Sequence, residues 1–189
     1  MNIFSVHQNP KQAAQDLCDS HVVKMITESS QMLSTAHRVL DGHEYTVKQN
    51  GRRIKRWFLD SSLELLVYKA SHINHPCNLW VREYDSNYLW LHEHALALCA
   101  EYTRRYDRVH ACQQMLSGPL SATPKMIRSS IFLTEFAQAM PDQYKDPDPI
   151  YAYRLFYIHD KSRFAKWRLG NVPEWFAEAT NGSMVRNGS

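Results

Sequence analysis

The sequence predicts a mostly α protein: a single compact helical domain that carries one short, basic β-hairpin. Apolar residues recur at spacings of three and four along several segments, which is the pattern of amphipathic helices. No linker or repeat divides the 189 residues, and 44% of them are hydrophobic, so one core is expected. We expect the domain to span 1–179 and the polar end of the chain, 180–189, to form a flexible tail.

The first part of the chain is predicted to be an extended lead-in followed by helices. Residues 1–6 are expected to form a short strand or extended chain, and Asn9-Pro10 is typical of the start of a helix. The next helical segment, as one helix or two abutting ones, covers Asp16 to Leu40. It ends at Gly42, a residue type common just after helices.

Residues 44–57, EYTVKQNGRRIKRW, are predicted to form a β-hairpin, because Asn50-Gly51 suits the positive φ angles of a type I′ turn. This segment holds five of the 22 basic residues and one of the 19 acidic ones, and without it the net charge of +3 would become −1. The patch suits phosphate contacts, or alternatively keeps an exposed edge from aggregating. Its basic side chains are Lys48, Arg52, Arg53, Lys55 and Arg56.

The remaining elements are predicted from capping residues and prolines. Ser61 and Glu64 have the spacing of a capping box before the helical pattern LELLVYKASHI. Asp85-Ser86 is a plausible cap for the long helix NYLWLHEHALALCAEYTRRY. Further helices are expected over about 109–116 and 123–137, and a last one from Asp148-Pro149 to Gly170.

Several classes of protein are disfavoured by the sequence. No apolar run approaches the roughly 20 residues that cross a bilayer, and no signal peptide is visible, so we expect a cytoplasmic protein without membrane contact. The four cysteines lack CxxC spacing and are expected to be reduced and buried. Motifs of phosphate-binding loops, dinucleotide folds and serine hydrolases are absent.

The first candidate site lies on the helix predicted over 16–40. His21, Lys24, Glu28 and Gln31 are spaced so that they share one helix face. An imidazole, an ammonium and a carboxylate placed together can perform acid–base chemistry on a base or a sugar. The alternative is a solvated helix face with ordinary charge pairs.

The second candidate is the segment with His72, His75 and Cys77, whose side chains are types that zinc prefers. Pro76 interrupts the segment, however, and no paired CxxC or HExxH spacing accompanies it. We therefore favour a structural turn in which His75 or Asn74 caps a helix, and we expect no metal or other cofactor.

The third candidate is the helix that begins at Pro149. Its predicted basic face suits contacts with phosphates, while its aromatic residues suit base stacking or core packing. Solvated cations beside a packed core are the alternative. The face includes Arg154, Lys161 and Arg168, with Lys166 close by.

A family resemblance joins these observations. The opening MNIFSVHQNP, followed by a helix with Asp19-x-His21 and Glu28, resembles the phage and bacterial pyrimidine-dimer DNA glycosylases, which are small all-α enzymes. The segments EYTRRYDRVH and AYR…K…W…PEWF are similar to uncharacterised phage relatives of that group.

The resemblance implies that the α-amino group of the chain attacks the sugar carbon C1′ and forms an imine while a helix carboxylate assists. Glu28 matches that carboxylate, His21 is its neighbour on the same helix, and Met1 offers the amine. Known members expose Thr after removal of the initiator methionine, whereas the bulky Asn2 is expected to retain Met1 here. Lys24 is the substitute amine if burial depresses its pKa.

The leading hypothesis is therefore an N-glycosylase that acts as a monomer on damaged or modified pyrimidines in double-stranded DNA, with abasic-site lyase activity. If the protein is phage-encoded, its place is the host cytoplasm. The alternative is a non-catalytic DNA-binding accessory protein of a phage. A third hypothesis is an enzyme that acts on free nucleotides.

Overall fold

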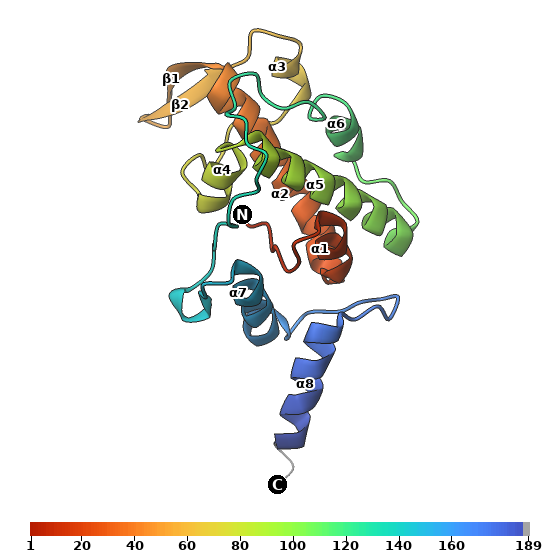
Figure 1. Cartoon of the computed structure of the whole chain (residues 1–189). Coiled ribbons are helices and arrows are strands. Elements are labelled where there is room, and N and C mark those ends of the chain that lie inside the picture. Colours follow the sequence, from red (N-terminus) through yellow and green to blue (C-terminus); the bar gives the residue numbers. More distant parts are fainter. Residues whose placement is uncertain (187–189) are drawn as a thin grey trace.

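Helix α5 (Asp85–Tyr106) lies at the centre of the molecule and packs against α2 (Asp19–Asp41) and α1 (Pro10–Asp16), as Figure 1 shows. The structure is a computed structural model that describes residues 1–186. The buried side chains of α5 recur every three or four residues, so that one face of the helix meets the core. The mostly α class is confirmed.

The N-terminal segment is extended chain that enters the core. Ile3, Phe4 and Val6 are buried, and residues 1–6 form no strand. The segment leads into α1, where the Asn9 side chain accepts hydrogen bonds from the main-chain N–H groups of Lys11 and Gln12. The predicted helix start at Asn9-Pro10 is confirmed.

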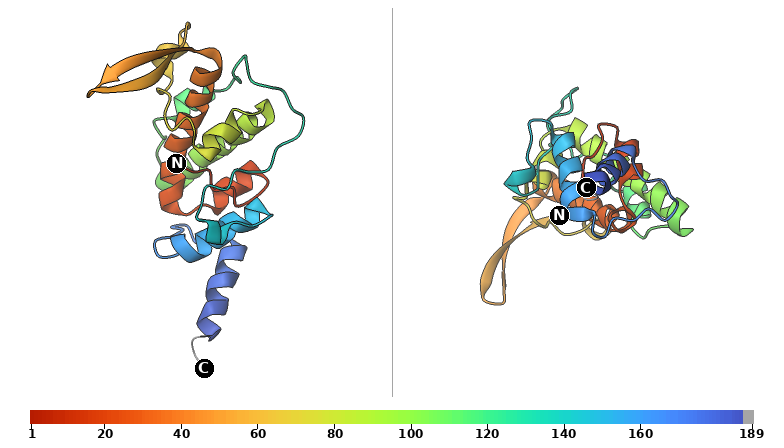
Figure 2. Two further views of the ribbon diagram at one scale, coloured as in Figure 1. Left: turned by 90° about the vertical axis from the view of Figure 1, so that its left-hand side faces the viewer. Right: turned by 90° about the horizontal axis from the view of Figure 1, so that it is seen from below.

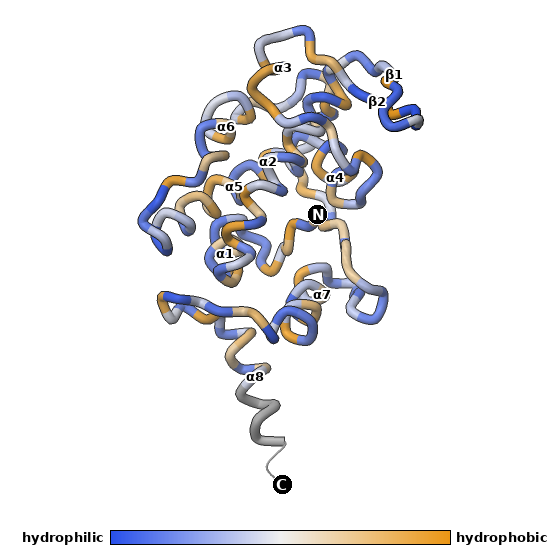
Figure 3. Tube along the Cα trace, turned by 180° about the vertical axis from the view of Figure 1, so that it is seen from behind, coloured by the Kyte–Doolittle hydropathy of each residue, from blue (hydrophilic) through white to orange (hydrophobic). Residues whose placement is uncertain are grey.

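The predicted hairpin is confirmed with its turn. Strands β1 (His43–Gln49) and β2 (Arg52–Phe58) pair antiparallel, with Val47 opposite Ile54. Asn50 and Gly51 have φ angles of 50° and 77°, as a type I′ turn requires. The hairpin projects away from the helices and is largely hydrophilic (Figures 2 and 3).

Arg38 of α2 holds the segment that follows the hairpin. Its side chain is 2% exposed, and its guanidinium pairs with the Glu64 carboxylate at 2.6 Å. It also donates to the main-chain carbonyls of Trp57, Glu64, Val67 and Tyr68. One buried side chain therefore joins α2 to β2 and to the chain beyond it.

The long helix predicted from LELLVYKASHI is wrong. Helix α3 (Leu63–Leu66) covers one turn only, and the carbonyls that a longer helix would use internally are bonded to Arg38 instead. The predicted capping box is wrong as well, because the Glu64 carboxylate accepts from the Leu59 N–H. Tertiary hydrogen bonds thus replace helical ones in this segment.

The helix predicted over 123–137 is also wrong, and α6 (Gln113–Ser117) lies partly beyond the range predicted for it. Residues 123–137 form an extended loop whose main-chain groups bond to side chains of neighbouring helices. Asp41 accepts from the N–H groups of Lys125 and Met126, and Asp85 accepts from that of Ser130. These side-chain partners substitute for the hydrogen bonds of a helix.

The last predicted helix, from Asp148-Pro149 to Gly170, begins where it is predicted to begin and ends earlier than predicted. Helix α7 (Pro149–Phe156) begins with the Asp148 side chain accepting from the Ile150 N–H, as expected. The helix ends at Phe156 instead of running to residue 168, because the chain widens into a π turn, η2 (Tyr157–Lys161), that buries Tyr157.

Three further elements complete the described chain: α4 (Pro76–Val81), the short 3₁₀ turn η1 (Asp142–Tyr144) and α8 (Glu174–Arg186). The division into a domain over 1–179 and a tail over 180–189 stays a prediction, and residues 187–189 lie outside the described residues. None of the described helices has both the length and the apolar character of a membrane span. All four cysteines are free and buried.

Replacing Arg38 with Met tests its role as an anchor. The change removes the cation paired with the Glu64 carboxylate and the donor of four carbonyls, so we expect a loss of about 3–5 kcal/mol in the free energy of unfolding. Urea unfolding followed by circular dichroism measures it. The exposed Arg53→Met variant is the control and should lose less than about 0.5 kcal/mol. A loss below about 1 kcal/mol for Arg38→Met would contradict the anchoring role.

Candidate active site

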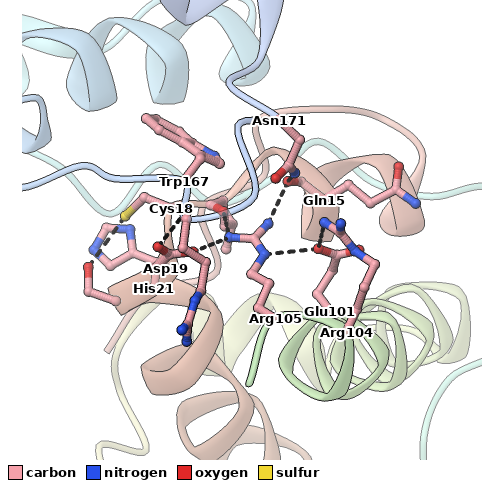
Figure 4. A network of polar contacts seen from close by, with 12 residues as sticks. Gln15, Cys18, Asp19, His21, Glu101, Arg104, Arg105, Trp167 and Asn171 are labelled. Carbon is pink, nitrogen blue, oxygen red and sulfur yellow. Dashed lines mark hydrogen bonds and ion pairs between the residues drawn. The ribbon is translucent and has the colours of Figure 1, made fainter. Parts of the chain in front are cut away.

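The start of α2 is held in place by a buried arginine from α5. Arg105 is fully buried, and its guanidinium donates to the Gln15 and Leu17 carbonyls at the end of α1. It also pairs with the Asp19 carboxylate at the start of α2, at 3.0 Å, and with Glu101 (Figure 4). The helix that carries the predicted site is therefore fixed relative to both α1 and α5.

Glu28 of α2 meets the beginning of the chain. Its side chain is 13% exposed, and its Oε2 atom accepts a 2.8 Å hydrogen bond from the main-chain N–H of Asn2. The same oxygen lies 3.8 Å from the α-amino nitrogen of Met1, and Oε1 lies 3.4 Å from Nζ of Lys24. The structure thus brings three of the predicted site residues, Met1, Lys24 and Glu28, together at one carboxylate.

Met1 is anchored by its side chain. That side chain is 2% exposed, and its Sδ atom lies 3.1 Å from Nδ2 of Asn78 in α4. The residue as a whole is only partly buried, so most of its exposed surface belongs to the main chain. The buried side chain thus holds the α-amino nitrogen at a fixed position beside Glu28.

Asn2 completes the anchoring, and sequence reasoning identified it only as a bulky second residue. Its Oδ1 accepts from the Ile3 N–H and from the Tyr153 hydroxyl, both at 2.8 Å. Its Nδ2 donates to the Ala139 carbonyl at 2.8 Å. The available signal was a single polar residue at the start of an apolar lead-in. This signal does not predict which residues, more than a hundred positions away, Asn2 binds.

His21 lies on α2 one turn before Lys24 and is buried. Its ring stacks on Phe4 with centroids 4.3 Å apart, and its Nδ1 is 2.8 Å from the Tyr157 hydroxyl. Burial, followed by the charges of Lys161 and Lys24, lowers the pKa of His21 from its ordinary 6.5 to about 4. The imidazole is therefore neutral at physiological pH, and Lys24 and Lys161 are close enough to act on it.

The predicted DNA-binding residues fall into two places. Lys48, Arg52, Arg53 and Lys55 are exposed on the hairpin, and Arg56 is half-buried. Two of the five are held within the hairpin, since Lys55 pairs with Glu44 at 2.9 Å and Arg56 donates to the Gln49 side chain. The remaining three basic residues, Arg154, Lys161 and Lys166, lie beyond the start of α7.

The continuous basic helix face predicted for these three is wrong, because α7 ends at Phe156. Nε of Arg154 donates to the Val6 carbonyl, and its guanidinium lies over Trp175 beside a hollow of about 410 Å³. Lys161 is 18% exposed and pairs with Asp160, and its ammonium lies over the Phe156 ring. Lys166 is exposed. The three cations therefore stand in different surroundings.

The segment of His72, His75 and Cys77 forms the structural turn that the sequence favours. Nδ1 of His75 accepts from the Cys77 N–H at 3.2 Å and caps α4. Cys77 is fully buried, and burial raises the pKa of its thiol to about 12. No cluster of three or more potential metal ligands occurs among residues 1–186.

Comparison of the sequence with known proteins identifies a family for the chain. The sequence model of the family described as pyrimidine dimer DNA glycosylase matches residues 1–114. The chain belongs to this family. No curated protein and no solved structure matches the chain.

The part matched to the glycosylase family holds Met1, His21, Lys24, Glu28 and the hairpin, whereas the C-terminal part adds contacts around them. The Tyr153 hydroxyl binds Asn2, and the Tyr157 hydroxyl binds His21 and the Cys18 N–H. Residues outside the matched range thus brace the site that the matched range builds.

The lowered pKa of His21 predicts how stability depends on pH. The unfolded chain binds a proton at His21 near pH 6.5 and the folded protein only near pH 4, so stability is complete above 6.5 and falls as the pH drops toward 4. The contribution is on the order of 3 kcal/mol. His21→Gln should flatten this slope in urea unfolding between pH 7 and 4.

Part of the dependence of stability on pH should remain in His21→Gln, since burial also lowers the pKa values of His37 and His94. His43→Gln, at an exposed hairpin position, is the control and should keep the wild-type slope. An identical slope for His21→Gln and wild type would contradict the burial of a neutral imidazole.

Proposed function

We propose that the protein is a DNA N-glycosylase that acts on damaged or modified pyrimidines in double-stranded DNA and forms an imine through the α-amino group of Met1. The observation that carries the proposal is the 3.8 Å approach of this amine to Oε2 of Glu28, in a chain of the pyrimidine dimer glycosylase family. The lyase step, in which the imine leads to strand cleavage at the abasic site, is part of the proposal.

The amine and the carboxylate divide the chemistry. The Met1 nitrogen attacks C1′ of the target nucleotide, the bond from C1′ to the base breaks, and the base takes a proton from water. Glu28 removes a proton from the attacking nitrogen and later returns it to the sugar. The Asn2 N–H holds the carboxylate by the oxygen that faces the amine, so the two groups are positioned before DNA binds.

Met1 is the better of the two candidate nucleophiles. The ordinary pKa of an α-amino group is about two units below that of a lysine, so more of it is unprotonated at neutral pH. The Lys24 side chain is 64% exposed, which leaves its amine solvated. We assign Lys24 the role of a cation that contacts DNA phosphates near Glu28, and His21 the role of a neutral group that supports Phe4 and the N-terminal segment.

The cations outside the site are proposed to bind the phosphates of the duplex. The hairpin projects with Lys48, Arg52, Arg53, Lys55 and Arg56, and contacts with the DNA backbone would use charges exposed in this way. Lys161, Lys166 and the terminal nitrogens of Arg154 are proposed as further phosphate contacts. Bending the duplex between the two groups would help the target nucleotide leave the base stack.

Reduction of the imine by borohydride tests the mechanism. Wild-type protein, duplex DNA with one abasic site and sodium borohydride should give a covalent adduct, and tryptic mapping should place the DNA on peptide 1–11, which holds Met1. Glu28→Gln should form the adduct at least about a hundredfold more slowly, because the proton acceptor is lost. UV-irradiated duplex DNA should be cleaved with the same dependence on Glu28.

The control for this experiment is Glu93→Gln, an exposed glutamate paired with Lys11, which should react like wild type. Adduct on Lys24 would reassign the nucleophile. No adduct together with normal DNA binding would eliminate the imine mechanism and leave the non-catalytic DNA-binding alternative.

The salt dependence of binding tests the hairpin. Each lost phosphate contact lowers the slope of log K against log salt by about 0.9, so Arg52→Ala/Arg53→Ala should lower it by up to about 2 and weaken binding. Fluorescence anisotropy with a labelled duplex measures both quantities. Arg108→Ala, an exposed arginine just beyond α5, is the control, and an unchanged slope in the double variant would remove the hairpin from the interface.

A further inference from the structure

The turn before α4 lies against the residue that carries the amine. Nδ2 of Asn78 is 3.1 Å from Sδ of Met1 and 3.0 Å from the His72 carbonyl oxygen. The main-chain N–H of His75 donates to that same carbonyl at 2.9 Å. Asn78 therefore ties the turn of residues 72–75 to Met1.

The His75 ring has one nitrogen occupied and one free. Because Nδ1 accepts a hydrogen bond from the Cys77 N–H, the neutral ring carries its proton on Nε2. Among residues 1–186, Nε2 has no hydrogen-bond partner, and the side chain is only partly buried. The cap of α4 thus fixes a tautomer with an unpaired N–H group on a side chain that is partly exposed.

This ring interacts electrostatically with both members of the proposed catalytic pair. Burial lowers the pKa of His75 most, the charges of the Met1 ammonium and of His72 lower it further, and Glu28 raises it. His75 is consequently neutral at physiological pH, and the charges of the amine and of the carboxylate both act on it.

We propose that Nε2–H of His75 donates a hydrogen bond to the ring oxygen O4′ of the nucleotide that Met1 attacks. This inference rests on the proposed function. O4′ is bonded to C1′, the carbon that receives the amine, so a donor that serves O4′ must come from a segment held against Met1, as the turn of residues 72–75 is through Asn78.

The contact would act when the sugar ring opens. The nitrogen lone pair forms the C1′=N bond, the C1′–O4′ bond breaks, and its electron pair goes to O4′. O4′ then takes the proton that Glu28 removed from the amine, so the products are a protonated imine and a Glu28 carboxylate. His75 keeps its proton throughout, and its N–H stabilises the negative charge that develops on O4′, as a neutral imidazole can do.

The test is His75→Asn, with His72→Asn as the matched control. Asn is a good N-cap residue and its side chain is too short to reach the position of Nε2, so the first variant keeps α4 and removes the donor from that position. His72 is an exposed histidine of the same turn with a φ of 48°, which Asn tolerates. If His75→Asn fails to fold by circular dichroism, His75→Ser provides a second residue that can cap α4.

Single-turnover adduct formation on abasic duplex DNA should slow at least about tenfold in His75→Asn. The rate of adduct formation by His72→Asn should stay within about twofold of the wild-type rate. The Kd of His75→Asn for DNA should also stay within about twofold of the wild-type value. The loss should be uniform from pH 6 to 9, because a donor that acts on O4′ lowers the plateau of the rate profile. A shifted profile would instead mean that His75 acts through the protonation of the amine, which would overturn the proposal.

The remaining outcomes separate this inference from the proposed function. Adduct formation by His75→Asn at the wild-type rate overturns the inference alone. A slower rate matched by an equal rise in Kd assigns His75 to binding and overturns it as well. Absence of adduct with wild-type protein overturns both.

Discussion

The hydrogen bond from the main-chain N–H of Asn2 to the Glu28 carboxylate is the interaction on which the site depends. It fixes the first peptide unit against α2, so the α-amino group has little freedom of its own. Chain ends are ordinarily poorly ordered, and holding one in place requires contacts on several sides. Here Asn78 contacts the Met1 side chain and the Tyr153 hydroxyl donates to that of Asn2. Both side chains are thus used to hold the segment, and the amine is the group that we propose reacts.

The supports of this hydrogen bond come from the whole chain. Arg105 fixes the start of α2 from the far end of α5. The Tyr153 hydroxyl binds Asn2, and the Tyr157 hydroxyl binds the Cys18 N–H just before α2. The partners are 86 to 151 residues apart in the sequence. Because these contacts join elements of the core, the position of the amine is coupled to the stability of the fold, and loosening a distant support would displace the amine that we propose as the nucleophile.

Local sequence signals predict the parts of the fold that depend on neighbouring residues. Asn9-Pro10, Asn50-Gly51 and Asp148-Pro149 each specify their own cap or turn, and helical spacing alone places Lys24 beside Glu28. The signals fail where a distant side chain captures the main chain, as in the predicted helices after residue 66 and over 123–137. For the same reason, the anchoring role of Asn2 cannot be read from spacing.

If a fixed α-amine is the reactive group, lengthening the chain by one residue should prevent the reaction. A protein with one alanine added before Met1, released from an N-terminal fusion, retains every side chain but displaces the amine from Glu28 by about one residue length, roughly 3.5 Å. We expect that its imine formation on abasic duplex DNA falls at least about a hundredfold while its DNA affinity is retained. Imine formation at the wild-type rate would contradict it.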